Sequence, residues 1–254
     1  MAENQILGID VGASGIKGAI VNVKTGELVT ERFRVPTPFP SKPKAVAKSI
    51  AEVTNHFEWK GLIGVGFPSV IQNGIAKTAA NIDKKWVGTD VEKLLSSATG
   101  CPVYVRNDAD VAGIAELQFG AGKGKKGTVI LITIGSGLGS AVFSDGVLLP
   151  NSELGHLKFK DGIAEHYAAD SIRKKEDLSW EVWGKRFNEY LQHLEFLFSP
   201  DLILLGGGSS KKFEKYKHLI QTDCSVTPAK LLNHAGIIGA ACLAALNTKK
   251  TMTR

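Results

Sequence analysis

The chain has 254 residues, 43% hydrophobic and 22% charged, the composition of an ordinary globular protein with room for two modest lobes. It contains no run of eighteen apolar residues, and residues 1–5 carry neither a basic nor an apolar segment. We therefore expect a cytoplasmic chain with no membrane span or export signal. The three cysteines form no CxxC pair, which argues against a disulfide framework or a zinc knuckle. The formal charge of +6 suits an anionic ligand, although solubility alone would account for it.

The N-terminal half predicts a β-meander followed by alternating helices and strands. Apolar runs at 6–11, 16–23 and 28–35, separated by glycine-containing turns, are typical of the meander. Four prolines then delay a helix that begins near Ser41 and has an apolar face of Val46, Ile50, Val53 and Phe57. The remaining elements are a strand at 62–66, a helix at 89–98 capped by Thr89 and stopped by Gly100, a strand at 102–106, and a helix from the Asn107-Asp108-Ala109-Asp110 run to Phe119.

The C-terminal half repeats the opening pattern. An apolar strand at 128–134, a glycine turn at 135–139 and a return strand at 140–143 precede an Asp145-Gly146 hairpin and a strand at 147–149. A long helix follows, ending before Pro200, with apolar positions Val182, Trp183, Phe187, Tyr190, Leu191 and Leu194. A strand at 202–205 is closed by Gly206-Gly207-Gly208, and a helix of small residues covers 236–246.

The two glycine-containing hairpins have the same layout, about 122 residues apart. Each consists of an apolar strand, a glycine-rich turn and an apolar return strand. We interpret this as a duplication that gives two related lobes, each offering one glycine turn to a shared cleft, although glycine hairpins are common enough to recur by coincidence.

The glycine turns are candidate phosphate sites, because backbone N–H groups approach an anion closely where no Cβ intervenes. The first turn follows Asp10 and contains Gly12, Ser14, Gly15 and Lys17. The second offers Thr133 and Ser136 hydroxyls beside Gly135. Two other phosphate motifs are excluded: no GxxxxGK[ST] occurs, and the GxGxxG at 122–127 follows a helix and precedes a strand, the reverse of the dinucleotide-binding order.

Asn107-Asp108 stands at the end of a predicted strand. Transfer of a phosphoryl group to a hydroxyl requires a carboxylate that takes the hydroxyl proton, and Asp108 is placed for that role. The alternative is that Asp108 or Asp110 caps the following helix. The two interpretations are compatible if Asp110 caps while Asp108 faces the cleft.

Glu153 and His156 lie three residues apart on a predicted helical turn, which places them on one side of it. Carboxylate and imidazole groups in such a pair can bind neighbouring sugar hydroxyls, although His156 could equally be a structural residue or half of a metal site. The lysines fall in small groups that we interpret mostly as solvated surface, at 84–85, 123–126, 174–175 and 211–212.

Taken in order, five segments resemble the ROK family of sugar kinases, within the group that shares the actin–hexokinase fold. They are Gly8-Ile9-Asp10-Val11-Gly12 with Ser14 and Lys17, Asn107–Asp110, Gly135–Gly139, Glu153–His156 and Gly206–Gly208. Four others are similar to the polyphosphate-using glucokinases of that family, namely residues 35–38, 66–68, 78–86 and 198–201.

The resemblance implies an α/β fold of two actin/hexokinase-like lobes, duplicated in the manner of ribonuclease H, with central mixed sheets and an interlobe cleft. It implies a small lobe at 1–107, completed by the C-terminal helix 236–254, and a large lobe at 108–235. The implied reaction is phosphorylation of glucose at O6 by inorganic polyphosphate. A strictly ATP-dependent glucokinase or another hexose kinase is the alternative, and ATP as a second donor stays open.

The resemblance also implies roles for individual residues. Asp108 would be the general base, and glucose would be bound by Gly66, Asn81, Asn107, Asp108, Glu153 and His156. Donor phosphate would be bound by Asp10, Gly12, Ser14, Lys17, Thr133, Gly135 and Ser136, with magnesium on Asp10. Gly207 and Gly208 would stand where ATP-using relatives bind the nucleoside.

The chain departs from the family pattern in one respect: residues 157–169 lack the CxCGxxGC zinc cluster of many members, so we expect no zinc. A sugar-sensing regulator is disfavoured, because residues 8–10 begin too early for a preceding DNA-binding domain. Asp108 argues against an inactive sugar-binding module. We expect glucose and polyphosphate as partners, a homodimer, and neither nucleic acid nor membrane.

Overall fold

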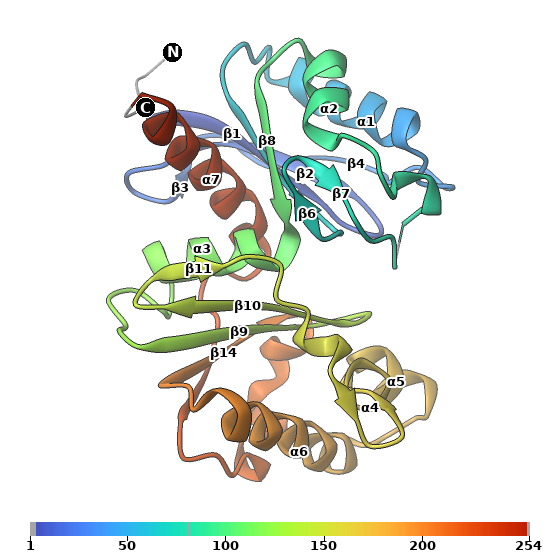
Figure 1. The fold of residues 1–254 in the computed structure, drawn as a ribbon, viewed down its shortest axis with the longest axis vertical. Coiled ribbons are helices and arrows are strands. Elements are labelled where there is room, and N and C mark those ends of the chain that lie inside the picture. The colour runs from blue at the N-terminus through green and yellow to red at the C-terminus, as the bar shows by residue number, and fades with distance from the viewer. Residues whose placement is uncertain (1–3, 81, 253–254) are drawn as a thin grey trace. The chain divides into compact units, whose positions relative to one another are not determined.

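A computed structural model describes residues 4–80 and 82–252. The chain divides into two compact units, Met1–Ala115 with His234–Arg254, and Glu116–Asn233. Each unit is built on its own mixed β-sheet (Figure 1).

The sheet of the first unit has the strand order β3-β2-β1-β5-β8, and β4 also pairs with β2. Its strands are β1 (Gln5–Val11), β2 (Ile16–Asn22), β3 (Glu27–Leu28), β4 (Phe33–Val35), β5 (Ile63–Phe67) and β8 (Val103–Asn107). Strands β6 (Ile71–Gln72) and β7 (Ile75–Ala76) form a separate hairpin. The single extended run expected at 28–35 is wrong, because it consists of the two short strands β3 and β4, which pair with different parts of β2.

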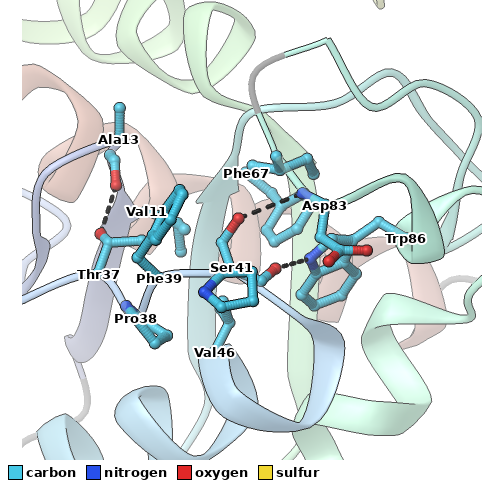
Figure 2. A pocket seen from close by; sticks show the side chains of 13 residues that line it. Val11, Ala13, Thr37, Pro38, Phe39, Ser41, Val46, Phe67, Asp83 and Trp86 are labelled. Atoms are coloured by element: carbon cyan, nitrogen blue, oxygen red, sulfur yellow. Dashed lines mark hydrogen bonds between the residues drawn. The ribbon is translucent and has the colours of Figure 1, made fainter.

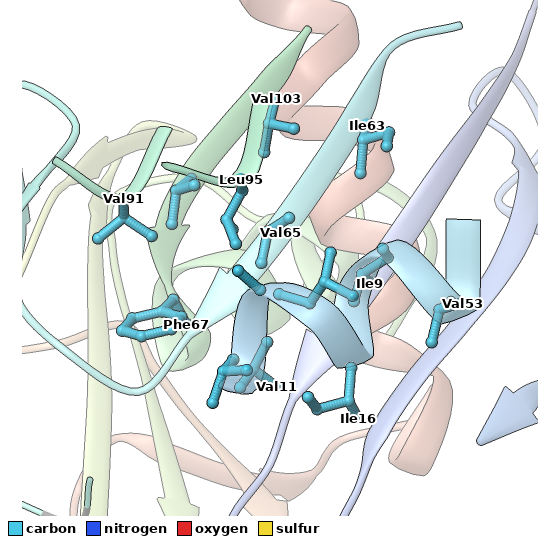
Figure 3. Packing of buried hydrophobic residues seen from close by; sticks show 14 of the residues in the cluster. Ile9, Val11, Ile16, Val53, Ile63, Val65, Phe67, Val91, Leu95 and Val103 are labelled. Carbon is cyan, nitrogen blue, oxygen red and sulfur yellow. The ribbon is translucent and has the colours of Figure 1, made fainter. Parts of the chain in front are cut away.

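Helices cover both faces of this sheet (Figure 1). Helices α1 (Pro43–His56) and α2 (Val91–Thr99) pack on the face that carries Leu7, Ile9 and Val11. Helix α7 (Ala235–Met252) lies on the opposite face, since alternate residues of a strand point to opposite sides. There a Cβ on Gly8 or Gly64 would collide with the α7 backbone. Figure 3 shows residues of the buried core on the α1 and α2 face, among them Ile9, Ile63 and Val65 from the strands and Val91 and Leu95 from α2.

The predicted helices of this unit are present, with one correction. Asp90, not Thr89, caps α2, because its carboxylate accepts from the Lys93 N–H at 2.9 Å. Gly100 ends α2 in the left-handed conformation, as expected. Val46, Ile50 and Val53 are buried on α1, as its apolar period predicted. Phe57, which follows α1, packs against the same core.

The second unit contains a sheet of order β11-β10-β9-β14-β15. Its strands are β9 (Thr128–Ile134), β10 (Leu138–Ser144), β11 (Val147–Leu149), β14 (Leu202–Gly207) and β15 (Ser225–Pro228). Smaller elements are the strand pair β12 (Lys158–Phe159) and β13 (Gly162–Ile163), helices α4 (Glu165–Ala168) and α5 (Asp170–Lys175), and the 3₁₀ turns η2 (Leu154–His156), η3 (Ser209–Lys215) and η4 (Lys217–Leu219). Helix α6 (Trp180–Phe198) buries Trp183, Phe187, Tyr190, Leu191 and Leu194. Val182, expected on that apolar face, is instead 47% exposed.

The two sheets have the same topology. In each, an antiparallel hairpin (β1–β2, β9–β10) is followed by two parallel strands added on the side of its first strand (β5 and β8, β14 and β15). The predicted duplication is therefore present in the strand order, and a coincidence of two glycine turns would not produce it. No helix in the part of the chain that the structure describes is long and apolar enough to span a membrane.

Candidate active site

The carboxyl ends of three parallel strands meet at one edge of the first unit's sheet. Asp10 on β1 is opposite Gly66 on β5, and the next residue of β5, Phe67, is opposite Asn107 on β8. Four sequence-predicted residues, Asp10, Gly66, Asn107 and Asp108, therefore lie along this edge. Ligands of open α/β sheets bind outside the carboxyl ends of the strands, so this edge is the candidate active site of the unit.

Asp10 is one of the two acidic residues among the four predicted residues on this edge, the other being Asp108. Its carboxylate lies 3.6 Å from the ammonium of Lys17, its register partner on β2, and the two side chains are 21% and 30% exposed. Burial raises the pKa of Asp10, and the Lys17 charge offsets part of that rise. Gly236, in the first turn of α7, is so close that a Cβ there would lie 2.9 Å from Oδ1 of Asp10. The carboxylate is therefore held against a helix N-terminus, which favours its charged form.

The side chains of Arg34 and Thr37, which follow β3 in the chain, hydrogen-bond to the glycine turn between β1 and β2. The Gly12 N–H donates to the Gly15 carbonyl at 3.1 Å, which closes the turn. The Thr37 hydroxyl donates to the Gly12 carbonyl, and the Arg34 guanidinium to the Ser14 carbonyl, both at 2.6 Å. Because carbonyl oxygens repel anions, these bonds weaken the repulsion that the turn would exert on a phosphate.

Asn107 takes the cap position of helix α3 (Asp108–Phe119) that the alternative interpretation gave to Asp108 or Asp110. The Asn107 Oδ1 accepts from the N–H groups of Ala109 at 2.9 Å and Asp110 at 3.2 Å, while its Nδ2 donates to the Ser69 carbonyl at 3.3 Å. Asp108 is the first helical residue and is half-buried; its Oδ1 accepts from the Ala109 N–H at 2.8 Å. Asn107 thus fixes the direction in which α3 leaves the strand, and with it the position of Asp108.

Asn81, a predicted glucose ligand, lies outside the described residues. The loop after it is anchored to Ser41, whose hydroxyl accepts from the Asp83 N–H at 3.2 Å and whose carbonyl accepts from the Trp86 indole at 2.8 Å. A cavity of about 390 Å³ lies here (Figure 2). Its lining includes Gly12 of the glycine turn and Phe67 at the end of β5, so it adjoins the strand ends described above.

The glycine turn of the second unit is held from α5. The Gly135 N–H donates to the Gly137 carbonyl at 3.0 Å, closing the turn as in the first unit. Ser171 donates twice, from its N–H to the Gly135 carbonyl at 3.2 Å and from its hydroxyl to the Ser136 carbonyl at 2.6 Å. A Glu165 carboxylate oxygen accepts from the Leu138 N–H at 2.9 Å, just past the turn.

Thr133 and the glycines after β14 lie at the same edge as this turn. Thr133 on β9 is opposite Gly206 on β14, and Ile134 is opposite Gly207. Gly207 has a φ of 78°, and a Cβ there would collide with the Ile134 backbone, so only glycine fits. The register therefore brings Thr133, Gly135, Ser136 and Gly207 to one edge of the sheet, with Gly208 following directly.

Glu153 and His156 are paired across the 3₁₀ turn η2. Nδ1 of His156 lies 3.0 Å from Oε2 of Glu153, and the side chains are 43% and 36% exposed. The turn is fixed to β10 by Ser140, whose hydroxyl accepts from the Leu154 N–H at 2.8 Å and donates to the Ser152 carbonyl. The two groups therefore lie on one side, as their spacing predicted.

Sequence analysis missed Arg34, Thr37, Ser41 and Ser171. Thr37 lies in the segment 35–38 quoted for the resemblance, but without a role of its own, and the other three belong to no motif; their partners are 20 to 45 residues distant. Among the lysines singled out, Lys174 is paired with Asp170 at 2.7 Å, in keeping with a structural surface role.

Comparison with known proteins places this arrangement in a family. The ROK family model matches residues 6–168. Polyphosphate glucokinase of Mycobacterium tuberculosis strain H37Rv is 46% identical over 242 residues, covering 95% of this chain and 91% of the relative. Polyphosphate glucokinase of Mycobacterium leprae is 43% identical over 235 residues, covering 92% of this chain and 72% of the relative.

Solved structures agree. The inorganic polyphosphate/ATP-glucomannokinase from Arthrobacter sp. strain KM superposes with a TM-score of 0.93 at 46% identity, covering 96% of this chain and all of that one. A ROK family glucokinase from Streptomyces griseus, solved with glucose and AMPPNP, has a TM-score of 0.80 at 23% identity over 95% and 99% of the two chains, which supports the fold alone. The chain belongs to the ROK family, and its two duplicated units have the actin/hexokinase-like fold.

Proposed function

We propose that the protein phosphorylates glucose at O6 with inorganic polyphosphate as the donor, giving glucose 6-phosphate. The observation that carries the proposal is the position of Asp108, directly after β8 on the sheet edge that also holds Asp10 and the adjoining glycine turn. The relatives of 43–46% identity, which are polyphosphate glucokinases, support the same substrates.

The chemistry assigned to Asp108 is proton removal. Its carboxylate takes the proton of the glucose 6-hydroxyl while that oxygen forms a bond to the terminal phosphorus and the bond to the rest of the polyphosphate breaks. Asn107 caps α3 and so fixes Asp108. We assign glucose binding to Asn81, Glu153 and His156 with the Gly66 backbone, and to Asn107 in addition to its capping role. Positioning contributes much of the rate in reactions of this kind.

Donor binding is assigned to the two glycine turns. In the first unit these are Gly12 and Ser14, with Lys17 and Asp10 on the adjoining strands; in the second they are Thr133, Gly135 and Ser136. The Gly12–Gly15 and Gly135–Gly137 bonds hold the two turns compact, and the N–H groups of the loop residues between these bonded pairs would be the ones that meet a phosphate. Gly207 and Gly208 remain the positions assigned to a nucleoside if ATP is used.

Kinases of this kind employ a divalent cation, and we propose Mg²⁺ on Asp10. Within residues 4–80 and 82–252 no three His, Cys, Asp or Glu side chains gather into a metal cage. Magnesium suits such a site, because it is bound through one or two carboxylates together with phosphate oxygens and water. The half-buried Asp10 carboxylate fits this donor set, and a bound cation would neutralise charge that develops on the transferred phosphate.

A strictly ATP-dependent kinase is the second candidate, while the Arthrobacter enzyme, a polyphosphate/ATP-glucomannokinase, supports ATP as a donor in addition to polyphosphate. One assay separates the two. Purified protein is incubated with glucose, Mg²⁺ and either ATP-free polyphosphate or ATP, and glucose 6-phosphate is measured. Product is expected with polyphosphate in the absence of ATP, whether or not ATP also serves as a donor. Product with ATP only would reduce the function to an ATP-dependent glucokinase, and no product with either would refute the proposal.

Two further expectations belong with this function. We propose a cytoplasmic homodimer that binds neither nucleic acid nor membrane. Light scattering of the purified protein with and without glucose measures the mass, and a monomer in both conditions would contradict the dimer.

A further inference from the structure

Three charged residues form a row across three strands of the first unit, next to its glycine turn. Asp10 on β1 is the register partner of Lys17 on β2, and Lys17 is in turn the partner of Arg34 on β4. Directly opposite residues on neighbouring strands point to the same face of a sheet. The row therefore places one carboxylate and two cations side by side, with a net positive charge at its β4 end.

The two cations differ in what they contact. Lys17 is 3.6 Å from Asp10. Arg34 is exposed, and its Nη2 donates to the Ser14 carbonyl at 2.6 Å. No carboxylate in the described part of the chain lies within ion-pair distance of Arg34. A guanidinium has five N–H donors, and the bond to Ser14 uses one of them. Within the described residues, no carboxylate therefore balances the positive charge of Arg34. The guanidinium lies over the turn, and the N–H donors that Ser14 does not use can bind another group.

The strand order shows on which side of β1 this positive charge lies. Asp108 follows β8, and the sheet runs from β8 through β5, β1 and β2 to β4. Strands in a sheet are about 4.8 Å apart, so β4 is roughly 10 Å beyond β1 on the side away from β8. The Arg34 side chain reaches back from β4 to the Ser14 carbonyl, so an anion whose terminal group is held beside β1 would meet the guanidinium with the phosphates behind the terminal one.

We propose that Arg34, together with Lys17, binds the internal phosphates of polyphosphate behind the one that is transferred, and so selects a long inorganic donor over ATP. This inference rests on the proposed function. Each internal phosphate of the polymer carries a negative charge and two oxygens that match the guanidinium fork. ATP presents a nucleoside after three phosphates and offers Arg34 less charge.

The test compares Arg34→Gln and Arg34→Lys with the wild type, using polyphosphate and ATP as donors at several salt concentrations. Gln can still donate to Ser14 but lacks the charge, and Lys keeps the charge. We expect Arg34→Gln to raise the KM for polyphosphate about tenfold with little change in kcat, since a hydrogen bond to a charged group is lost. The KM for ATP should change far less. The logarithmic salt dependence of the polyphosphate KM should become shallower by about one.

Arg34→Lys should retain most of the affinity for polyphosphate. Lys24→Gln is the matched control, because Lys24 is an exposed cation in the turn after the opposite end of β2, and it should leave both KM values unchanged. Calorimetric titration of inorganic polyphosphate into glucose-free protein gives a readout independent of turnover, in which Arg34→Gln should bind about tenfold more weakly.

The outcomes separate two failures. A wild type that uses polyphosphate, with an Arg34→Gln variant indistinguishable from it in KM and in titration, would refute only the role of Arg34. An equal loss of kcat with both donors in both Arg34 variants would make Arg34 a structural support of the Ser14 turn and overturn the inference. A wild type with no polyphosphate activity would overturn the proposed donor and this inference together.

Discussion

The hydroxyl of Ser171, the second residue of α5, donates to the carbonyl of Ser136 at 2.6 Å, and its N–H bonds the adjacent Gly135 carbonyl. Ser171 thus holds the glycine turn assigned to donor phosphate in the second unit through its hydroxyl and its backbone N–H. We expect Ser171→Ala to lower kcat about tenfold with both polyphosphate and ATP, because loss of one hydrogen bond loosens the turn by roughly 1 kcal/mol. Steady-state kinetics check this. Ser97→Ala, at an exposed position of α2, is the control, and equal kinetics in the two variants would remove Ser171 from donor positioning.

Asp108→Ala should lower kcat by roughly 10²–10⁴, because the proton of the acceptor hydroxyl then has no base. The fold should survive, since the cap of α3 is formed by Asn107. The measurements are turnover with polyphosphate, the thermal melt and glucose binding by fluorescence. Turnover at the wild-type rate in a folded variant would exclude Asp108 from the mechanism.

Asp10→Asn should abolish most activity and leave the fold at least as stable. Burial raises the pKa of Asp10 despite Lys17 and the helix N-terminus, which means that its charged form is less favourable in the folded than in the unfolded protein, and a neutral amide removes that cost. Lys17 keeps its solvation in the variant because it is 30% exposed. We expect kcat to fall about 10²–10³ with saturating Mg²⁺, in the range seen when one electrostatic group of an active site is lost. A variant that is both active and less stable than the wild type would contradict the assignment.

Asp170→Asn should show a stability defect that depends on pH. Burial would raise the pKa of Asp170, but the ammonium of Lys174 at 2.7 Å and the guanidinium of Arg173 at 2.8 Å outweigh it and lower the pKa below its ordinary value of 3.8. Its contribution to folding is therefore fully present above pH 3.8 and is lost as the pH falls through the lowered pKa.

Urea unfolding at neutral pH should find the Asp170→Asn variant less stable by about 1–2 kcal/mol, with most of the effect from Arg173, because Lys174 is 69% exposed. The difference from the wild type should shrink as the pH is lowered below 3.8. A constant difference across that range would show that the variant acts through packing and not through charge.

Local signals were enough for much of the fold. The hairpins, the Asp145-Gly146 turn and the apolar period of α6 are determined by residues close together in the chain, and the strands and helix that they predict are present. Two predictions, a single strand at 28–35 and a helix cap at Thr89, were wrong because the local pattern allowed two alternatives in each case. Pairing with β2 decided the first, and the Asp90 carboxylate decided the second.

By itself, the sequence determined the duplicated hairpins, the glycine turns and the strand end that carries Asp108, because each is set by residue type and by contacts between near neighbours. Only the tertiary structure decided which side chains hold those turns. Arg34 reaches Ser14 across 20 residues and Ser171 reaches Ser136 across 35, through strand pairing and helix packing. Such contacts depend on the register of β4 against β2 and on where α5 packs, and neither is encoded in the residues of the turns themselves.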